Sequence, residues 1–153
     1  MALSTGDAAP DFTLKDQHGV QVSLQQFHGK KNVVVVFYPF AFSSVCTGEL
    51  AEIRDNIADL RTESSEVLAI SCDSMYAVRA FADREGLTFP VLTDFWPHGA
   101  VARSYDNFND QLGCPGRSSY IIDRSGVLRW QVSNQLPQAR DLGAYRKVLA
   151  DLA

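Results

Sequence analysis

One cysteine stands where a protein can form a reactive thiolate. Cys46 follows the apolar run 33–38 and a loop that begins at Pro39. We expect a helix to begin near Ser43 or Ser44, which places Cys46 in the first helical turn. Unpaired backbone N–H groups and the positive end of the helix dipole both favour a thiolate there. The spacing therefore indicates a nucleophilic thiol, although a lone cysteine in a globular chain is more often a buried and inert side chain.

A thiolate needs more than its charge to react quickly. A fall in a thiol pKa from about 8.5 to about 6 raises the thiolate fraction at pH 7 roughly 30-fold, but intrinsic nucleophilicity falls about 10-fold over the same range. Hydrogen-bond donors must therefore stabilise the charge that develops in the transition state. The Ser43 hydroxyl is one candidate, because it lies three residues before Cys46, at capping distance, and could reach either the Cys46 backbone N–H or the reaction partner of the sulfur. The Cys46 N–H itself and an arginine are the others.

The composition argues against several other classes of protein. The chain has 153 residues and a formal net charge of −4, with Lys and Arg scattered along it, so we expect no nucleic-acid partner. No apolar stretch approaches the roughly 18 to 20 residues that a membrane span requires. The cysteines at 46, 72 and 114 have neither zinc-ligand spacing nor a disulfide pattern, so we expect no metal and no other cofactor. The start of the chain has no secretory-signal pattern, which favours the cytoplasm.

The apolar pattern predicts a single domain over residues 1–153 in which strands and helices alternate. The predicted strands are 11–14, 20–24, 33–38, 67–71, 88–92, 119–122 and 127–132. The predicted helices are 44–61, a helix capped by Asp73 or Ser74 that ends at Gly86, 99–105, and a C-terminal helix over 142–152. This order predicts an α/β, thioredoxin-like fold: a mixed central sheet flanked by helices, with an N-terminal hairpin. Such sheets carry their chemistry at the carboxyl ends of parallel strands, which is where Cys46 is expected.

The residues around the cysteine match the signature of a known family. Pro39, Ser43 and Cys46 reproduce the Pro-x-x-x-(Thr/Ser)-x-x-Cys motif of peroxiredoxins, and Arg117 opens a segment, 117–123, that has a counterpart there. The segments Gly-Asp-Ala-Ala-Pro-Asp-Phe-Thr-Leu near the start and Asp-Phe-Trp-Pro-His-Gly-Ala-Val in the middle of the chain have counterparts as well. The sequence resembles peroxiredoxins from end to end. It is similar to their one-cysteine, AhpE-type (alkyl hydroperoxide reductase E) subgroup of actinobacteria.

The resemblance implies a thiol-dependent peroxidase. Cys46 would attack hydrogen peroxide or an organic hydroperoxide, with peroxynitrite as a further candidate, and would become a sulfenic acid. Pro39 would shield the sulfur from solvent, and Ser43 would bond the peroxide where threonine is the more usual residue. Arg117 would support both the thiolate and the leaving oxygen. Glu49 would help to hold the arginine, although an acid in the first turn of a helix also complements the helix dipole.

The resemblance also implies partners. Without a resolving cysteine, the sulfenic acid must be reduced by an external thiol, for which the subgroup suggests mycothiol with a mycoredoxin, or thioredoxin. Cys114 lies three residues before Arg117 and is an alternative, internal resolving residue, whereas Cys72 is expected to fill space in the core. A homodimer or a larger homo-oligomer is expected. Phe42 and Trp96 would line either a pocket for organic hydroperoxides or the interface between subunits.

Three other functions fit the residues less well. A thioredoxin-type disulfide oxidoreductase shares the fold, but it would have Cys-x-x-Cys, and Cys46 is followed by Thr-Gly-Glu. A non-catalytic interaction protein or chaperone-like oligomer would leave no reason for the proline, hydroxyl, cysteine and arginine to occur together. A zinc site would require Cys46, Cys72 and His98 to converge.

Overall fold

A computed structural model describes residues 3–134 and 140–153 of the chain, and nine strands lie in that part. In chain order they are β1 (Thr13–Lys15), β2 (Gln21–Ser23), β3 (Asn32–Phe37), β4 (Ser65–Ser71), β5 (Val91–Thr93), β6 (Phe108–Asn109), β7 (Cys114–Pro115), β8 (Arg117–Ile122) and β9 (Leu128–Asn134). The helices are the 3-10 helix η1 (Leu24–Phe27), α1 (Ser44–Asp55), α2 (Ile57–Leu60), α3 (Met75–Glu85), α4 (Ala100–Ser104) and α5 (Leu142–Leu152).

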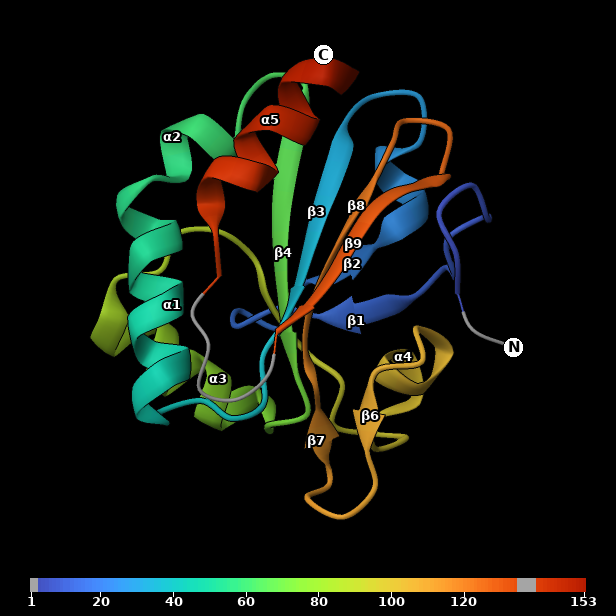
Figure 1. Cartoon of the computed structure of the whole chain (residues 1–153). Coiled ribbons are helices and arrows are strands. Elements are labelled where there is room, and N and C mark those ends of the chain that lie inside the picture. The colour runs from blue at the N-terminus through green and yellow to red at the C-terminus, as the bar shows by residue number, and fades with distance from the viewer. Residues whose placement is uncertain (1–2, 135–139) are drawn as a thin grey trace.

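Seven strands form one mixed sheet in the order β2-β1-β5-β4-β3-β8-β9 (Figure 1). The central strand β3 pairs in parallel with β4 and antiparallel with β8, and β4 pairs in parallel with β5. Parallel neighbours need a crossover, which α1 and α2 supply between β3 and β4, and α3 supplies between β4 and β5. The predicted mixed sheet and the N-terminal hairpin, β1 with β2, are confirmed.

The two faces of the sheet are covered by different elements. Every residue of β3 is buried, and side chains alternate between faces along a strand. Val34 and Val36 pack in a cluster with residues of α1, α3 and α5, whereas Val33 and Val35 pack in a second cluster with residues of η1 and α4. Figure 1 shows α1, α3 and α5 together on one side and α4 on the other. This layering decides which residues of β3 and β8 meet α1, where Cys46 lies.

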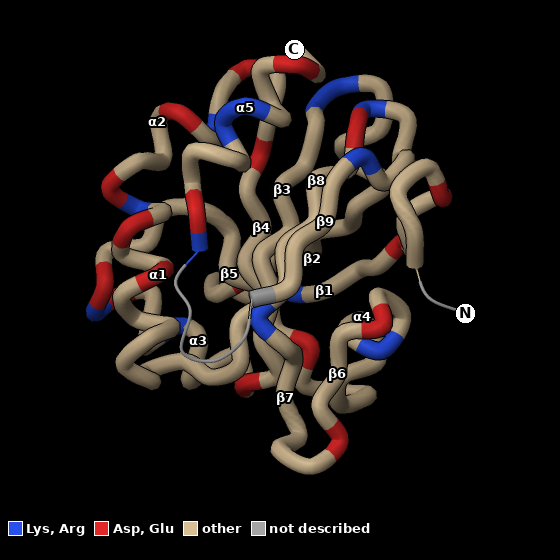
Figure 2. The backbone as a smooth tube through the Cα atoms, in the orientation of Figure 1, with Lys and Arg blue, Asp and Glu red and all other residues tan. Residues whose placement is uncertain are grey.

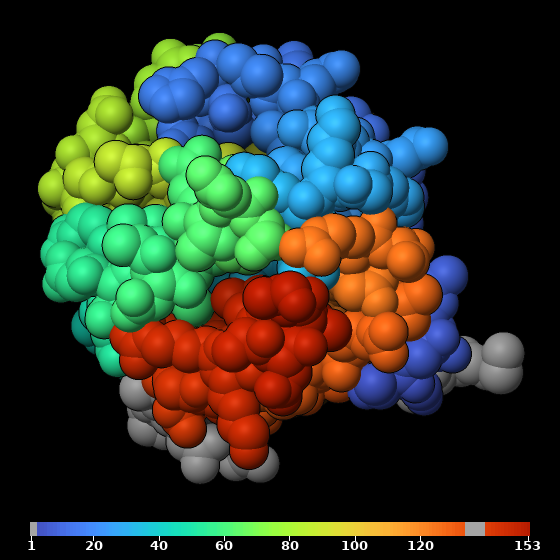
Figure 3. All heavy atoms as spheres, turned by 90° about the horizontal axis from the view of Figure 1, so that it is seen from above, coloured from blue at the N-terminus to red at the C-terminus, as the bar shows by residue number. Residues whose placement is uncertain are grey.

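The C-terminal helix closes the first of these faces. Figure 3 shows α5 in red between the green segment that contains α2 and the orange β8–β9 hairpin. Tyr145 and Leu149 of α5 are buried, and Arg146 donates to the Asp59 carboxylate at 3.1 Å and to the Asn56 side-chain oxygen at 2.8 Å. The amphipathic pattern predicted for 142–152 is therefore confirmed, and α5 is fixed against both α2 and the sheet.

Charged residues of both signs are interspersed over the molecule. Figure 2 shows Lys and Arg positions mixed with Asp and Glu positions along the described part of the chain. Within the residues that the structure describes, no helix is both long and apolar enough to cross a lipid bilayer.

The predicted helix 44–61 is interrupted. α1 ends at Asp55, and a short α2 follows after Asn56, whose φ of −114° and ψ of 18° are not helical. The Glu52 carbonyl accepts the Asn56 side-chain amide at 2.9 Å as well as the Asn56 backbone N–H at 3.1 Å. Asparagine side chains bond readily to nearby backbone groups and are common at helix ends, and the apolar spacing alone did not reveal this end.

Two other predictions can be compared with the structure, and one pair of strands was not predicted. The strand predicted at 88–92 is instead β5 at Val91–Thr93, because Pro90 has no N–H to donate to a ladder. The helix after Ser74 is confirmed: the Ser74 hydroxyl accepts from the Ala77 N–H, and Gly86 has the left-handed φ of 65° at the end. The small antiparallel pair β6–β7 was not predicted, since each strand has only two residues.

Candidate active site

The cysteine lies at the start of α1, as predicted. The chain leaves β3 through the buried Pro39, and Cys46 is fully buried in the first turn of the helix. Ser43 is the N-cap residue, but its hydroxyl donates to the Phe40 carbonyl at 2.9 Å and makes no capping bond. Of the two partners expected for this hydroxyl, the Cys46 N–H is therefore not bound in the resting structure, and the reaction partner of the sulfur stays a prediction. No side chain at the cap accepts a hydrogen bond from the N–H groups in the first turn of α1. The positive end of the helix dipole therefore remains uncompensated at the cap.

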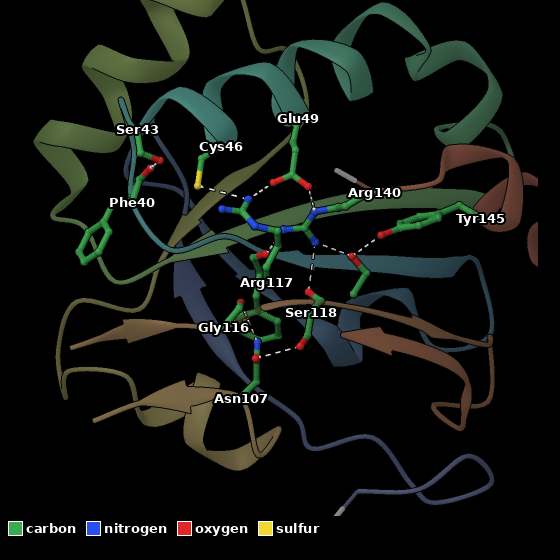
Figure 4. A network of polar contacts seen from close by, with 12 residues as sticks. Phe40, Ser43, Cys46, Glu49, Asn107, Gly116, Arg117, Ser118, Arg140 and Tyr145 are labelled. Atoms are coloured by element: carbon green, nitrogen blue, oxygen red, sulfur yellow. Dashed lines mark hydrogen bonds and ion pairs between the residues drawn. The ribbon is translucent and has the colours of Figure 1, made fainter. Parts of the chain in front are cut away.

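Arg117 reaches the cysteine from the neighbouring strand. It is the first residue of β8, which pairs with β3, and its Nη1 lies 3.6 Å from the Cys46 sulfur (Figure 4). Only 5% of Arg117 is exposed, so water screens its positive charge weakly. A guanidinium remains protonated at all ordinary pH values. The geometry therefore holds a permanent cation beside the sulfur.

Glu49 lies one helical turn after the cysteine, on the same side of α1, and joins two arginines. Its Oε1 accepts a hydrogen bond from Nη1 of Arg117, and its Oε2 accepts one from Nε of Arg140 at 2.9 Å. Glu49 is itself buried, so this is not the solvated acid of an ordinary first turn. The resemblance implied that Glu49 holds the arginine, and the structure brings these two side chains together.

Arg140 is a functional candidate that the sequence did not reveal. It lies just before α5 and is buried, and it donates to the Ser119 hydroxyl at 2.6 Å, to the Ser118 carbonyl at 3.3 Å and to the Phe37 carbonyl. Burial lowers the pKa of the Arg140 guanidinium, because the charged form loses its hydration. Ninety-one positions separate Arg140 from Glu49, so no local spacing signals the pair.

A cavity of about 250 Å³ opens beside the first turn of α1. Its polar wall comes from Ser43, Ser44 and Arg117, and its apolar wall from Pro39, Phe40, Val45 and Leu112. Phe40 and Leu112 are 41% and 55% exposed, so the outer part of the wall is open to solvent. The predicted Pro39, Ser43 and Arg117 therefore meet at one opening.

Phe42 and Trp96 lie away from this opening. The Phe42 ring packs on Phe81 with ring centroids 5.2 Å apart, and the guanidinium of Arg84 lies 4.6 Å from its centre. Trp96 is 82% exposed and lines a separate groove of about 470 Å³ with Tyr76 and Phe95, among others. The apolar residues at the opening beside Cys46 are Phe40, Val45 and Leu112 instead.

The other two cysteines are buried free thiols. Cys72 lies just after β4, and burial is the main cause that raises the pKa of its thiol to about 12, followed by the charge of Asp94. Cys114 lies in β7, and burial, with smaller contributions from Cys46 and Asp73, raises the pKa of its thiol as well. Both thiols are therefore protonated at neutral pH and are poor nucleophiles.

The residues weighed as a zinc site do not form one in the described part of the chain. His98 has its Nε2 2.7 Å from the Gly113 carbonyl and its Nδ1 3.2 Å from the Phe95 carbonyl. Within residues 3–134 and 140–153, no group of three His, Cys, Asp or Glu side chains lies together in a way that could hold a metal ion.

Comparison with known proteins gives concordant sequence matches. The model of the AhpC/TSA family matches residues 5–131. Alkyl hydroperoxide reductase E of Mycobacterium tuberculosis is 42% identical over 150 residues, which cover 98% of each chain. Chloroplastic peroxiredoxin Q of Triticum aestivum is 34% identical over 98% of this chain and 68% of its own length.

Solved structures give the same result at the level of the fold. Peroxidoxin BcpB of Mycobacterium tuberculosis superposes with a TM-score of 0.83 and 30% identity, over 98% of this chain and 96% of that chain. AhpC of Enterococcus faecalis superposes with a TM-score of 0.86 and 30% identity, over 99% and 93%. The predicted thioredoxin-like fold class is confirmed.

Proposed function

This chain belongs to the AhpC/TSA family of peroxiredoxins and is a thiol-dependent peroxidase, and we propose that Cys46 is the cysteine that reduces the peroxide. One observation carries the proposal: Nη1 of Arg117 lies 3.6 Å from the Cys46 sulfur, and the same arginine lines the cavity beside it. Burial raises the pKa of the Cys72 and Cys114 thiols. Of the three cysteines, all of which lie in the described part of the chain, Cys46 is the one in the first turn of a helix with a guanidinium beside its sulfur.

The proposed reaction is a two-electron oxidation of sulfur. The Cys46 thiolate attacks the terminal oxygen of the hydroperoxide, and the S–O bond forms while the O–O bond breaks. The sulfur becomes a sulfenic acid. The departing oxygen leaves with the electron pair of the O–O bond and takes up a proton, which gives water from hydrogen peroxide or an alcohol from an organic hydroperoxide.

The neighbouring groups have distinct proposed roles. Arg117 stabilises the negative charge on the departing oxygen as well as the thiolate, which is the kind of preorganised electrostatic assistance that lowers a barrier most. The Ser43 hydroxyl, which donates to the Phe40 carbonyl in the resting structure, turns to donate to the peroxide. Pro39 closes the sulfur off from bulk water, and Glu49 holds Arg117 in place.

The cavity wall supports a choice of substrate. Phe40, Val45 and Leu112 present an apolar surface, which suits the carbon chain of an organic hydroperoxide, and hydrogen peroxide needs only the polar wall. Peroxynitrite is a further candidate, because an anion is attracted to the Arg117 guanidinium.

An external thiol is the proposed reductant of the sulfenic acid. Because the Cys72 and Cys114 thiols are protonated at neutral pH, a small thiol or a redoxin is better placed to supply the second sulfur. Mycothiol with a mycoredoxin, or thioredoxin, is the specific proposal, and the cytoplasm is the proposed setting. A homodimer or larger homo-oligomer is proposed as well, for which Phe42 and Trp96 are exposed enough to supply contacts.

The test is rapid-quench oxidation of the reduced protein, with mass spectrometry of each cysteine peptide. Hydrogen peroxide and an organic hydroperoxide are each compared in the parent, Cys46→Ser and Cys72→Ser, a matched control that removes a buried thiol outside the site. We expect the fast phase to disappear in Cys46→Ser and to persist in Cys72→Ser. A fast phase that survives in Cys46→Ser would exclude Cys46 as the reacting residue.

A further inference from the structure

Asn107 binds the chain on both sides of Arg117. It lies between α4 and β6, is buried, and donates its backbone N–H to the carbonyl of Ala102 in α4. Its side-chain oxygen accepts from the Ser118 hydroxyl at 2.9 Å, and its side-chain nitrogen donates to the Gly116 carbonyl at 3.2 Å. Its backbone carbonyl also accepts from the Gly116 N–H at 3.1 Å. One residue therefore holds the residues immediately before and after Arg117.

Side chains of β8 alternate between the two faces of the sheet, which explains why Asn107 binds this strand on the face opposite to the active site. Arg117 and Ser119 point to the face that α1 and α5 cover, where they meet Cys46 and Tyr145. Ser118, which lies between them, points to the opposite face, and there it meets Asn107. Figure 4 shows Asn107, Gly116 and Ser118 below the strand and the Arg117 guanidinium above it, beside the sulfur.

The Arg117 guanidinium depends on this support because few groups hold it directly. Nη1 donates to Glu49 and contacts the sulfur, whereas Nε of Arg117 is buried and finds no acceptor among the described residues. The side chain is therefore fixed at its tip by Glu49 and at its base by the backbone. A shift of the base moves the nitrogen that faces the Cys46 sulfur.

Gly116 makes the close approach possible. A Cβ added to Gly116 would overlap the side-chain oxygen of Asn107, so the amide can lie against this position only when residue 116 has no side chain. Glycine is therefore required at position 116 because a side chain would overlap Asn107, and not because the backbone has a positive φ.

We propose that Asn107 is a positioning residue for peroxide reduction, which holds Arg117 in register with Cys46 by binding Gly116 and Ser118 on the far side of the sheet. The proposal rests on the proposed role of Arg117 at Cys46. Asn107 does not touch the peroxide, and its removal is expected to act only through the arginine.

A double-mutant cycle tests this. The rate constant for oxidation of Cys46 by hydrogen peroxide is measured by rapid quench in the parent, Asn107→Ala, Arg117→Ala and the double variant. A misplacement of about 1 Å can cost as much as about 100-fold in rate, so we expect Asn107→Ala to slow the parent about 10-fold. In the Arg117→Ala background the same change should have no further effect, because the group that it positions is absent.

Two further variants separate positioning from general damage to the fold. Gly116→Ala should slow oxidation to a similar extent, because its methyl group displaces the Asn107 amide. Ser133→Ala is the matched control: it removes the other partner of the Ser118 hydroxyl, 2.8 Å away, and leaves the Asn107 bonds in place, so the rate should stay within about twofold of the parent.

The outcomes are distinguishable from those of the proposed function. Loss of the fast phase in Cys46→Ser concerns the proposed function alone and is measured separately. An Asn107→Ala protein that keeps the parental rate overturns the positioning role. So does one that is slowed equally in both backgrounds, since its effect would not pass through Arg117. If Asn107→Ala does not fold, the Gly116→Ala and Arg117→Ala pair gives the same comparison.

Discussion

Glu49 and Arg140 form a buried ion pair, with Oε2 of the carboxylate 2.9 Å from Nε of the guanidinium and side chains that are 4% and 2% exposed. The other carboxylate oxygen, Oε1, accepts a hydrogen bond from Nη1 of Arg117. With Cys46 as a thiolate, the site holds two anions and two cations, and removal of one of them leaves a buried charge without its partner. Such an arrangement fixes geometry more than it adds stability.

Glu49→Gln removes one charge and keeps the shape of the side chain. Its amide can accept from one guanidinium, but its NH₂ group faces the other, which is also a donor. We expect the free energy of unfolding to fall by about 3 to 5 kcal/mol, as when one partner of a buried ion pair is removed. We also expect Cys46 to be oxidised about 10-fold more slowly, because Arg117 loses its anchor.

Urea unfolding and rapid-quench oxidation measure the two effects. Glu52→Gln is the matched control, since Glu52 is an exposed acid of the same helix, and it should change neither quantity appreciably. A Glu49→Gln protein as stable as the parent would show that the carboxylate is not needed to pair the two arginines.

Substitution of Ser43 tests whether its hydroxyl, which donates to the Phe40 carbonyl in the resting structure, assists the reaction with peroxide. Ser43→Ala removes a donor to the peroxide, and loss of one preorganised donor typically costs about 100-fold in rate or more. Because the hydroxyl must first leave the Phe40 carbonyl, we expect a smaller loss, of about 10- to 100-fold. Ser43→Thr keeps the donor and should retain the parental rate within about threefold, as its added methyl only restricts the rotamer.

Ser104→Ala is the control for this pair. The Ser104 hydroxyl also donates to a carbonyl three residues earlier, that of Val101, at 2.6 Å, but it lies in α4 on the other face of the sheet. Its removal should leave oxidation unchanged. Equal rates in Ser43→Ala and the parent would show that neither a bond to the peroxide nor the bond to the Phe40 carbonyl contributes to the rate.

The sequence predicts the frame of this site because its signals are local. The apolar run before Pro39, the cap at Ser74 and the glycine at 86 each depend on a few neighbouring residues, and the structure agrees with them. The helix that ends at Asp55 shows the limit of this approach. Its apolar spacing continues past Asn56, but the backbone of Asn56 is not helical, and apolar periodicity carries no signal for such a break.

The parts of the site that the sequence missed are long-range pairings of single residues. Arg140 meets Glu49 across 91 positions, and Asn107 meets Gly116 and Ser118 across the loop that contains β6 and β7. No periodicity or motif marks such residues, because only the packed sheet brings them together. Arg117 was found for a different reason, namely the resemblance of its segment to a known family.

Formation of a disulfide between Cys46 and Cys114 is expected to depend on pH. Burial, with the charges of Cys46 and Asp73, raises the pKa of this thiol, so the attacking thiolate is scarce at neutral pH and increases as the pH rises. After one equivalent of hydrogen peroxide at pH 7, we expect dimedone to trap a sulfenic acid at Cys46, and little Cys46–Cys114 disulfide. At pH 10 the disulfide should form faster. Peptide mass mapping distinguishes the two products.

The Cys114→Ser protein is the control, because its dimedone labelling at pH 7 should equal that of the parent. If instead the parent forms the internal disulfide at pH 7 faster than dimedone reacts, Cys114 is a resolving residue. An external thiol would then have to reduce a disulfide instead of a sulfenic acid.

Leu112 tests whether the apolar wall of the cavity selects substrates. Full burial of a leucine side chain contributes about 1.5 to 3 kcal/mol, and Leu112 is already nearly half-buried, so contact with a substrate is worth about 1 kcal/mol. Leu112→Ser should therefore slow oxidation by cumene hydroperoxide about fivefold and leave oxidation by hydrogen peroxide unchanged, because hydrogen peroxide has no carbon chain to bury. Val20→Ser, at a similarly exposed apolar residue in the β1–β2 turn, should alter neither rate. Equal losses with both peroxides would show that Leu112 supports the loop before Arg117 and does not contact the substrate.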